Sequence, residues 1–155
     1  MRNRRLVRSL ALVLPFVAMS AFSRPAEAQT GLQFFAVTPC RAADTRTGFG
    51  GILPASTVRN FTIKTVCGIP TTAKAVSVNV TVVAPNADGF FFVWPAGGTI
   101  PGVSTINFNA GEPAIANGAI VPLNTAGVPD LSGAYGTASG SGNAHVVLDV
   151  TGYFQ

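Results

Sequence analysis

The residues best suited to chemistry gather between Thr38 and Arg46, in a stretch that holds a cysteine, two arginines and an acid. Cys40 can act as a nucleophile or form a disulfide, and Asp44 lies two residues before Arg46, within reach of an ion pair. Guanidinium groups bind carboxylates through paired hydrogen bonds. Arg41 and Arg46 together therefore also suit an acidic ligand such as a sugar acid. The stretch allows thiol catalysis, a structural clasp or anion binding.

The beginning of the chain has the three parts of a secretory signal peptide. Four arginines precede an apolar run from Leu10 to Phe22, and Ala26-Glu27-Ala28 supplies small residues around a cleavage point. The apolar run is shorter than the ~20 residues that a membrane-spanning helix needs. We therefore expect a signal peptide over 1–28, cleavage after Ala28 and a secreted, extracellular or cell-surface protein with no membrane anchor.

The charge of the chain changes once this leader is set aside. The whole sequence has 10 Lys and Arg residues against 6 Asp and Glu residues, but the leader holds five of the arginines and one of the acids. Residues 29–155 therefore carry five basic and five acidic groups, and no net charge. The basic balance gives no support to a nucleic-acid or membrane partner for the exported part.

Export also bears on the cysteines. Cys40 and Cys67 are the only two in the chain, and an oxidising compartment makes a disulfide between them the leading interpretation. Closing a loop of this length destabilises the unfolded chain by ~3 to 4 kcal/mol on the entropic model. The alternatives are two separate buried thiols, or a catalytic Cys40 paired with His145. A cysteine held in a disulfide is not a nucleophile.

If Cys40 is structural, the charged residues near it are most simply structural too. We expect Asp44 to cap turn amides and Arg46 to pair with a carboxylate such as Asp149, or with free carbonyls. The three would form a polar clasp. Arg41 and Arg46 as a fork for a carboxylate is the functional alternative, and nothing in the sequence selects it.

The sequence gives little support for metal binding or hydrolytic catalysis. His145 is the only histidine, the acids are scattered through different loops and strands, and neither a calcium-binding loop nor a G-x-S-x-G motif is present. Four residues of strand between His145 and Asp149 separate them by roughly 13 Å, too far for a catalytic relay. We predict no catalytic residue, no cofactor, no metal ligand and no enzymatic activity.

The elements that must position these residues are strands. Val76, Val78, Val80 and Val82 share one face of the longest alternating segment, as expected for a strand buried on one side. A short turn after it leads into an aromatic run, which predicts an antiparallel hairpin. The expected strands are 32–37 (ended by Pro39), 57–63, 73–84, 90–94, 103–108, 114–123 (one bulged strand or two short ones) and 144–154. The sequence therefore predicts an all-β domain over 29–155: a single antiparallel β-sandwich or jelly roll of about eight to nine strands.

The aromatic run Phe90 to Trp94 allows two roles. Rings this dense usually fill the space between two sheets, although a strand that exposes alternate rings can also stack against sugars. If one face is core, Phe90, Phe92 and Trp94 go together and Phe91 faces the other way. We therefore take Phe91, together with Arg41, as a candidate partner surface.

Six short motifs occur in order over nearly all of 29–155: Phe35-x-x-Thr38-Pro39-Cys40-Arg41-x-x-Asp44-Thr45-Arg46, Cys67-Gly68-Ile69-Pro70, Ala73-x-Ala75-Val76-x-Val78-Asn79-Val80-Thr81, Ser104-Thr105-x-Asn107-Phe108, Ala116-Asn117 and Asp149-Val150-x-Gly152-Tyr153-Phe154. On these motifs the chain resembles a family of bacterial exported domains whose function is largely uncharacterised. Members of this family occur alone, in tandem or beside cell-wall hydrolases and peptidases. The resemblance implies an extracellular location and a non-catalytic accessory or surface role, and it implies no ligand.

Taken together, these features predict a secreted, non-catalytic structural or interaction module at the cell surface or in the extracellular matrix. Its partner is itself or a surface polymer, because exposed strand edges with few charges recruit further strands. A carbohydrate- or peptidoglycan-binding accessory module is the alternative, and a hydrolase comes third.

Overall fold

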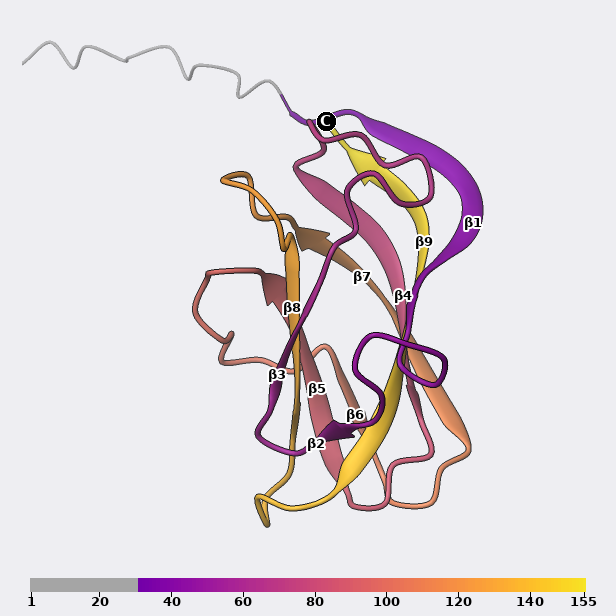
Figure 1. The fold of residues 1–155 in the computed structure, drawn as a ribbon, viewed down its shortest axis with the longest axis vertical. Coiled ribbons are helices and arrows are strands. Elements are labelled where there is room, and N and C mark those ends of the chain that lie inside the picture. Colours follow the sequence, from indigo (N-terminus) through magenta and orange to yellow (C-terminus); the bar gives the residue numbers. More distant parts are fainter. Residues whose placement is uncertain (1–30) are drawn as a thin grey trace, which may run out of the picture. The chain divides into compact units, whose positions relative to one another are not determined.

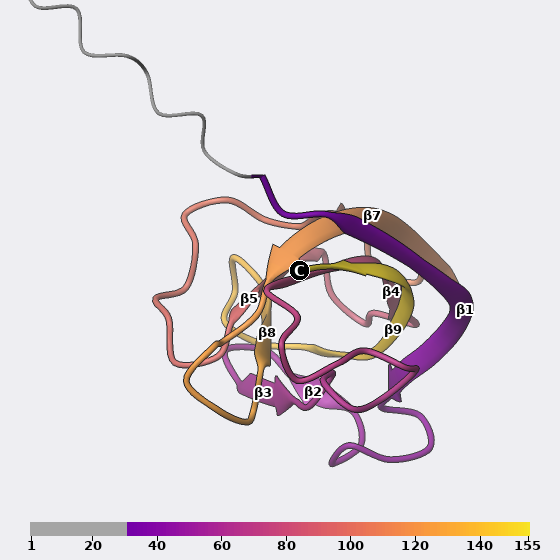
Figure 2. The ribbon, with the colours of Figure 1, turned by 90° about the horizontal axis from the view of Figure 1, so that it is seen from above.

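A computed structural model describes residues 31–155, which form nine strands and no helix (Figure 1). The strands make two antiparallel sheets that face each other across a core, so the predicted β-sandwich is confirmed (Figure 2). The signal peptide expected over 1–28 lies outside the described residues.

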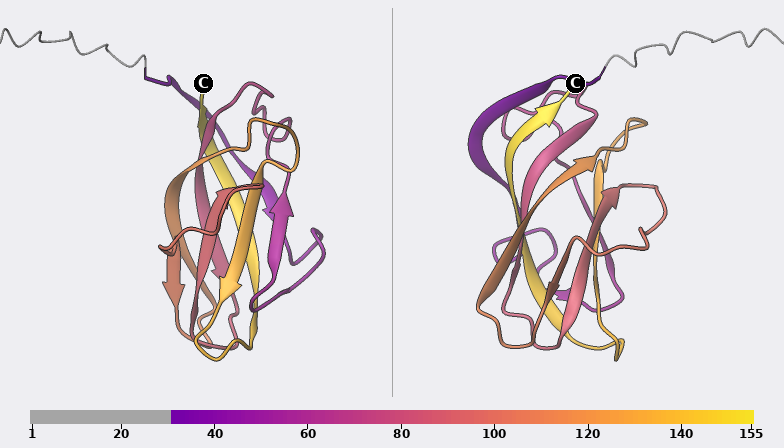
Figure 3. Two further views of the ribbon diagram at one scale, coloured as in Figure 1. Left: turned by 90° about the vertical axis from the view of Figure 1, so that its left-hand side faces the viewer. Right: turned by 180° about the vertical axis from the view of Figure 1, so that it is seen from behind.

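The larger sheet has five strands in the order β1-β9-β4-β7, with β2 beside β9, and the smaller sheet has four in the order β3-β8-β5-β6 (Figure 3). In the large sheet the bounds are β1 (Phe34–Asp44), β2 (Leu53–Pro54), β4 (Ala75–Val83), β7 (Ala114–Pro122) and β9 (Asn143–Phe154). In the small sheet they are β3 (Val58–Phe61), β5 (Gly89–Pro95), β6 (Ile106–Phe108) and β8 (Leu131–Gly136).

The core follows the alternation of the sequence. All four alternate valines of β4 are buried, and so are Val146, Leu148 and Val150 of its neighbour β9. The small sheet supplies rings to the same core, among them Phe61 and Phe91, which are almost fully buried. Burying such side chains stabilises the fold by about 1.5 to 3 kcal/mol each.

The hairpin predicted between β4 and β5 is wrong, because these strands belong to different sheets. The residues between them carry the chain from one sheet to the other. Tyr135 Oη donates to the carbonyl of Ala87 at 3.0 Å, and the amide of Asn143 donates to Asn86 Oδ1 at 2.7 Å. Since both strands have an apolar face, each buries that face against the opposite sheet instead of pairing with the other.

Two further elements differ from the expectation. β1 does not end before Pro39 but runs on to Asp44, with register shifts between Ala36 and Cys40 and again between Arg41 and Ala43. Proline is tolerated there because β1 is an edge strand and is irregular at that point. β7 is one strand without a bulge, paired continuously with β4.

β8 has a weak sequence pattern but lies in the middle of the small sheet. The pattern is weak because two positions of the strand are glycines, which leave space for neighbouring rings. A Cβ on Gly133 would lie 2.5 Å from the ring of Phe91, and one on Gly136 would lie 2.1 Å from the ring of Phe90. The β8 glycines therefore make room for aromatic side chains of the neighbouring strand β5.

Candidate functional site

The disulfide between Cys40 and Cys67 is confirmed, with the two Cα atoms 5.7 Å apart. It joins β1 to the loop that follows β3, where Thr65 and Cys67 both have positive φ angles. Positive φ is rare for residues with a Cβ, above all for a β-branched residue such as Thr65. The bridge thus fixes a loop whose backbone lies in an unfavourable region.

The charged residues around Cys40 form a chain of ion pairs. Arg41 lies opposite Asp149 in the β1–β9 register and donates to it from Nε at 2.8 Å and from Nη2 at 3.1 Å. Arg46 instead pairs with Asp44, from Nε at 2.9 Å and from Nη2 at 2.6 Å. Arg41 Nη1 connects the two pairs, 3.4 Å from Asp44 Oδ2. The pairing expected between Arg46 and Asp149 is therefore replaced by one between Arg41 and Asp149.

Asp44 caps the turn that follows β1, as its position in the sequence suggested. Its Oδ1 accepts the backbone amide of Arg46 at 3.0 Å, and its carbonyl accepts the amides of Thr47 and Gly48. The hydrogen bonds from the Arg46 guanidinium hold the pKa of Asp44 well below its ordinary value, and burial opposes them only in part. The carboxylate is thus charged over the whole ordinary pH range, with both of its oxygens engaged.

Protonation of Asp44 in acid should therefore lower the stability of the folded protein. Its pKa is lower in the folded than in the unfolded protein, so its contribution is present above the unfolded value of about 4 and is lost as the pH falls below it. We expect the melting temperature of the wild type to fall more steeply between about pH 4 and pH 2 than that of Asp44→Asn. Parallel melting curves for the two proteins over this interval would contradict the assignment.

A shallow hollow lies beside this ion-pair chain. It has a volume of about 380 Å³ and is lined by Pro39, Cys40, Arg41 and Asp149. The Arg41 side chain is half exposed here, so its guanidinium can receive an additional acceptor. Of the residues taken from the sequence as a partner surface, Arg41 is the one that remains accessible.

Phe91 is not part of any partner surface, which corrects the second half of that expectation. Its side chain is 0 % exposed and packs in the core, together with Val93. Phe90 and Phe92 occupy the opposite face and contact each other edge to face at 5.0 Å. The core therefore takes the ring that the alternation had assigned to the outside, because the inner face of β5 is the one with Phe91.

Exposed aromatic residues occur instead in the turn after β1, where Phe49 is 46 % exposed, and at the start of β1, where Phe34 and Phe35 contact the partly exposed rings at the end of β9. Phe34 is opposite Phe154, with ring centroids 5.0 Å apart, and Phe35 stacks on Tyr153 at 5.1 Å. Tyr153 also pairs with the buried Val76, so Phe35 and Tyr153 face inward and Phe34 and Phe154 face outward.

Gly152 gives the Phe34 ring its place on this outer face. A Cβ at position 152 would lie 2.4 Å from both Cε2 and Cζ of Phe34, so the ring covers the glycine. The other side of the ring is open, since Phe34 is 51 % exposed. Sequence reasoning missed this aromatic shelf, defined here as Phe34, Gly152 and Phe154, although two of its members belong to the terminal G-Y-F signature.

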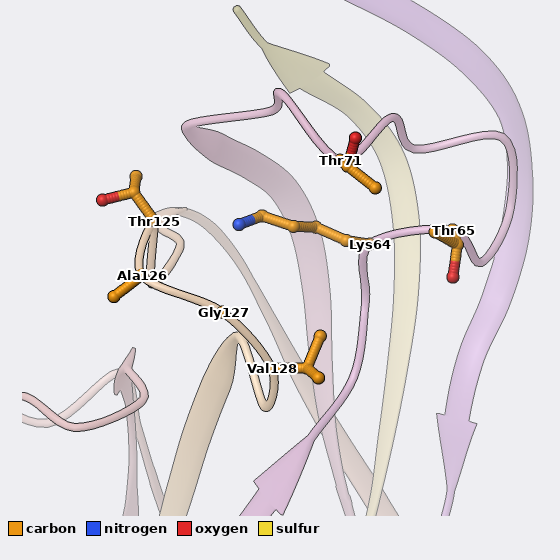
Figure 4. Close-up of a pocket in the computed structure, with 7 residues that line it drawn as sticks. All are labelled: Lys64, Thr65, Thr71, Thr125, Ala126, Gly127 and Val128. Atoms are coloured by element: carbon orange, nitrogen blue, oxygen red, sulfur yellow. The ribbon is translucent and has the colours of Figure 1, made fainter.

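A second hollow, of about 300 Å³, lies between the loop that begins at Lys64 and the loop 125–128 (Figure 4). Lys64 reaches across it and donates from Nζ to the carbonyl of Asn124, which joins the two loops. Most of its lining is apolar, and Thr65, Thr71 and Thr125 are the hydroxyl-bearing residues among those that line it. No feature of the sequence marked these loops as neighbours.

Asp130, which follows the loop 125–128, is fully buried and accepts two backbone amides on Oδ2, those of Ile63 at 2.5 Å and Lys64 at 2.6 Å. Its Oδ1 has no hydrogen-bond partner within 31–155. The carboxylate thus fixes the chain where it leaves β3.

Other sites of chemistry can be placed briefly. His145 Nδ1 is 3.2 Å from Thr45 Oγ1, which itself accepts the amide of Val146 at 2.8 Å. Across 31–155 no three His, Cys, Asp or Glu side chains gather in a metal-binding arrangement, and no helix there is long and apolar enough to span a membrane. Comparison with protein-family models, with curated proteins and with solved structures finds no match for this chain.

Proposed function

We propose that the protein is a secreted, non-catalytic interaction module that acts at the cell surface or in the extracellular matrix and associates with itself. The observation that carries this proposal is the open outer edge of β1. Within 31–155, β1 is the terminal strand of the large sheet and pairs only with β9 (Figure 1). Unpaired backbone groups along such an edge are a template for another strand.

The beginning of β1 lacks the usual protection of an edge. Natural edges are blunted by charged side chains, but no charged residue occurs from Gly31 to Cys40. The side chains there are apolar and exposed instead, with Leu32 at 52 % and Phe34 at 51 %. Residues 31–155 carry five basic and five acidic groups, so electrostatic repulsion between copies is weak.

The engagement of the acids supports a non-catalytic role. Each of the five carboxylates in 31–155 accepts a hydrogen bond from another group of the protein: Asp44, Asp88, Glu112, Asp130 and Asp149. Of the two hollows described above, one is lined by no acid and the other only by Asp149, which is paired with Arg41, so neither presents two carboxylates to a substrate. Export is supported by the disulfide, which is typical of oxidising compartments, and by the expected leader.

Light scattering of the exported form, beginning after Ala28, tests self-association directly. We expect a dimer at high concentration that dissociates on dilution, with a dissociation constant in roughly the micromolar to sub-millimolar range for so short an edge. The association should persist in high salt, since few charges contribute to it. A monomer at every concentration would contradict the proposed function.

A saccharide-binding module is the second candidate, and one observation favours it. The exposed Phe34 ring lies on the same outer face of the large sheet as the Arg41–Asp149 pair, so this face carries both a stacking surface and planar hydrogen-bonding groups. Sedimentation with insoluble cell-wall polysaccharide tests this candidate. Retention that Arg41→Ala weakens would support it, and recovery of all the protein in the supernatant would exclude it.

A further inference from the structure

We propose that two copies join through the start of β1, as antiparallel strands, with Phe34 lying opposite Phe34 of the partner subunit on a two-fold axis. This inference rests on the proposed self-association and adds the surface and the register. It extends the large sheet of one copy into that of the other through the segment 32–36.

The hydrogen bonds at the end of β9 determine which backbone groups are free. Gln33 and Gln155 exchange both of their bonds, the amide of each donating to the carbonyl of the other at 2.9 and 3.0 Å. Such pairs alternate along an antiparallel ladder, so Phe35 and Tyr153 form the next one. The N–H and C=O groups of Leu32, Phe34 and Ala36 therefore point away from β9 and toward solvent.

These outward groups are spaced to pair with the same groups of a second copy. In an antiparallel pair centred on Phe34, Leu32 of one copy faces Ala36 of the other, and the reverse holds on the far side of the axis. Each of the three pairs then exchanges two backbone hydrogen bonds. Because the contact uses the same patch on both copies, it closes at two and leaves no further edge of this kind.

The irregularity after Ala36 limits the pairing to this segment. The register with β9 shifts between Ala36 and Cys40, and Pro39 has no amide to donate. The strand beyond that point therefore does not continue the outer ladder. A short pairing segment of this kind suits a defined dimer better than an extended fibre.

The side chains do not obstruct the edge. The Phe34 ring covers Gly152 of β9, so it inclines back over its own sheet and leaves the outward backbone of Phe34 uncovered. In the proposed pair, the two Phe34 rings lie side by side across the axis, and each is flanked by Phe154 of its own copy. Cross-strand aromatic pairs of this kind add about 0.2 to 1 kcal/mol each.

Charge substitution at position 34 tests both the surface and the register. We expect Phe34→Glu alone and Phe34→Lys alone to be monomeric at concentrations where the wild type is a dimer, because like charges would lie directly opposite each other. Mixing the two variants in equal amounts should restore a dimer, since only a register that places residue 34 opposite itself brings Glu and Lys together. Light scattering measures all three samples.

Ile120 supplies the matched control. It is 65 % exposed and lies on β7, the other edge of the large sheet. The corresponding Ile120→Glu should remain as dimeric as the wild type. Circular dichroism melts of the position 34 variants check that a loss of association does not come from unfolding.

The outcomes separate the register from the proposed function. A dimeric wild type whose Phe34→Glu and Phe34→Lys variants stay dimeric overturns the surface and leaves self-association standing. Monomeric variants whose mixture stays monomeric overturn the register. In the wild type, amide exchange at Phe34 and Ala36 should slow at least tenfold from dilute to concentrated solution, and unchanged exchange in a dimeric sample overturns the β1 contact.

Discussion

Replacing Asp130 with alanine is expected to lower the free energy of unfolding by about 2 to 5 kcal/mol, because two buried amides lose the one acceptor that the described part of the chain gives them. Those amides belong to Ile63 and Lys64, at the point where the chain leaves β3. A loss of this size is a large fraction of the 5 to 15 kcal/mol that typically stabilises a domain. Chemical denaturation with urea measures it.

The effect should be large because Asp130 joins several elements. Its amide donates to the carbonyl of Phe61 at the end of β3, and its carbonyl accepts the amides of Ala96 after β5 and Asn124 after β7. The Asp130 side chain thus holds the amides that follow β3, and its main chain bonds to β3 and to the segments that follow β5 and β7. Loss of the carboxylate therefore loosens the point at which these three segments meet.

Two variants make the Asp130 result interpretable. Asp130→Asn retains one side-chain oxygen as an acceptor for the two amides and should lose less stability than Asp130→Ala. Asp88→Ala is the control: exposed Asp88 accepts a single amide within the described residues, that of Ala110 at 2.7 Å, so this variant should lose less than about 1 kcal/mol. Equal midpoints for Asp130→Ala and Asp88→Ala would contradict this account.

The alternation of the sequence was sufficient to predict the fold class. Valines at every second position of β4 indicated one buried face, and all four are buried. Export context and an even number of cysteines predicted the bridge between Cys40 and Cys67. Both inferences depend on properties that are local or compositional, which is why they were accessible without a structure.

Strand pairing was less accessible. The short connection after β4 suggested a hairpin, but the requirement that both β4 and β5 bury an apolar face placed them in opposite sheets. The same requirement reversed the assignment of Phe91, which the densest aromatic run had suggested as a surface residue. Local turn signals cannot reveal which of two apolar faces meets which sheet, because that depends on every other strand.

The candidate site was predictable only in its charged part. The stretch from Thr38 to Arg46 indicated a clasp, although Arg41 takes the partner expected for Arg46. The aromatic shelf was not predicted because Phe34 and Gly152 are distant in sequence, and neither has a reactive or charged side chain. Asp130 likewise resembles any acid in a loop until its burial is known.

The second large effect is expected at the disulfide. The double variant Cys40→Ser, Cys67→Ser should lose about 3 to 4 kcal/mol and melt roughly 10 to 15 °C below the oxidised wild type. The reduced wild type should match it, which controls for the serines themselves. Coinciding melting curves for the oxidised and reduced wild type would contradict this prediction.

Amide exchange distinguishes two ways in which the bridge can stabilise the protein. If it acts only by restricting the unfolded chain, local exchange in the folded state should be unchanged. The loop around Cys67, however, has positive φ angles at Thr65 and Cys67, and its internal bonds run between Thr65 and Ile69 and between Val66 and Ile63. Unfavourable backbone conformations persist only where the surroundings hold them. We therefore expect amide exchange at Thr65 and Ile69, which occurs by local opening, to accelerate in the double variant. A bridge that acts only on the unfolded chain would leave it unchanged and accelerate only amides that exchange by global unfolding, such as that of Val80 in the core.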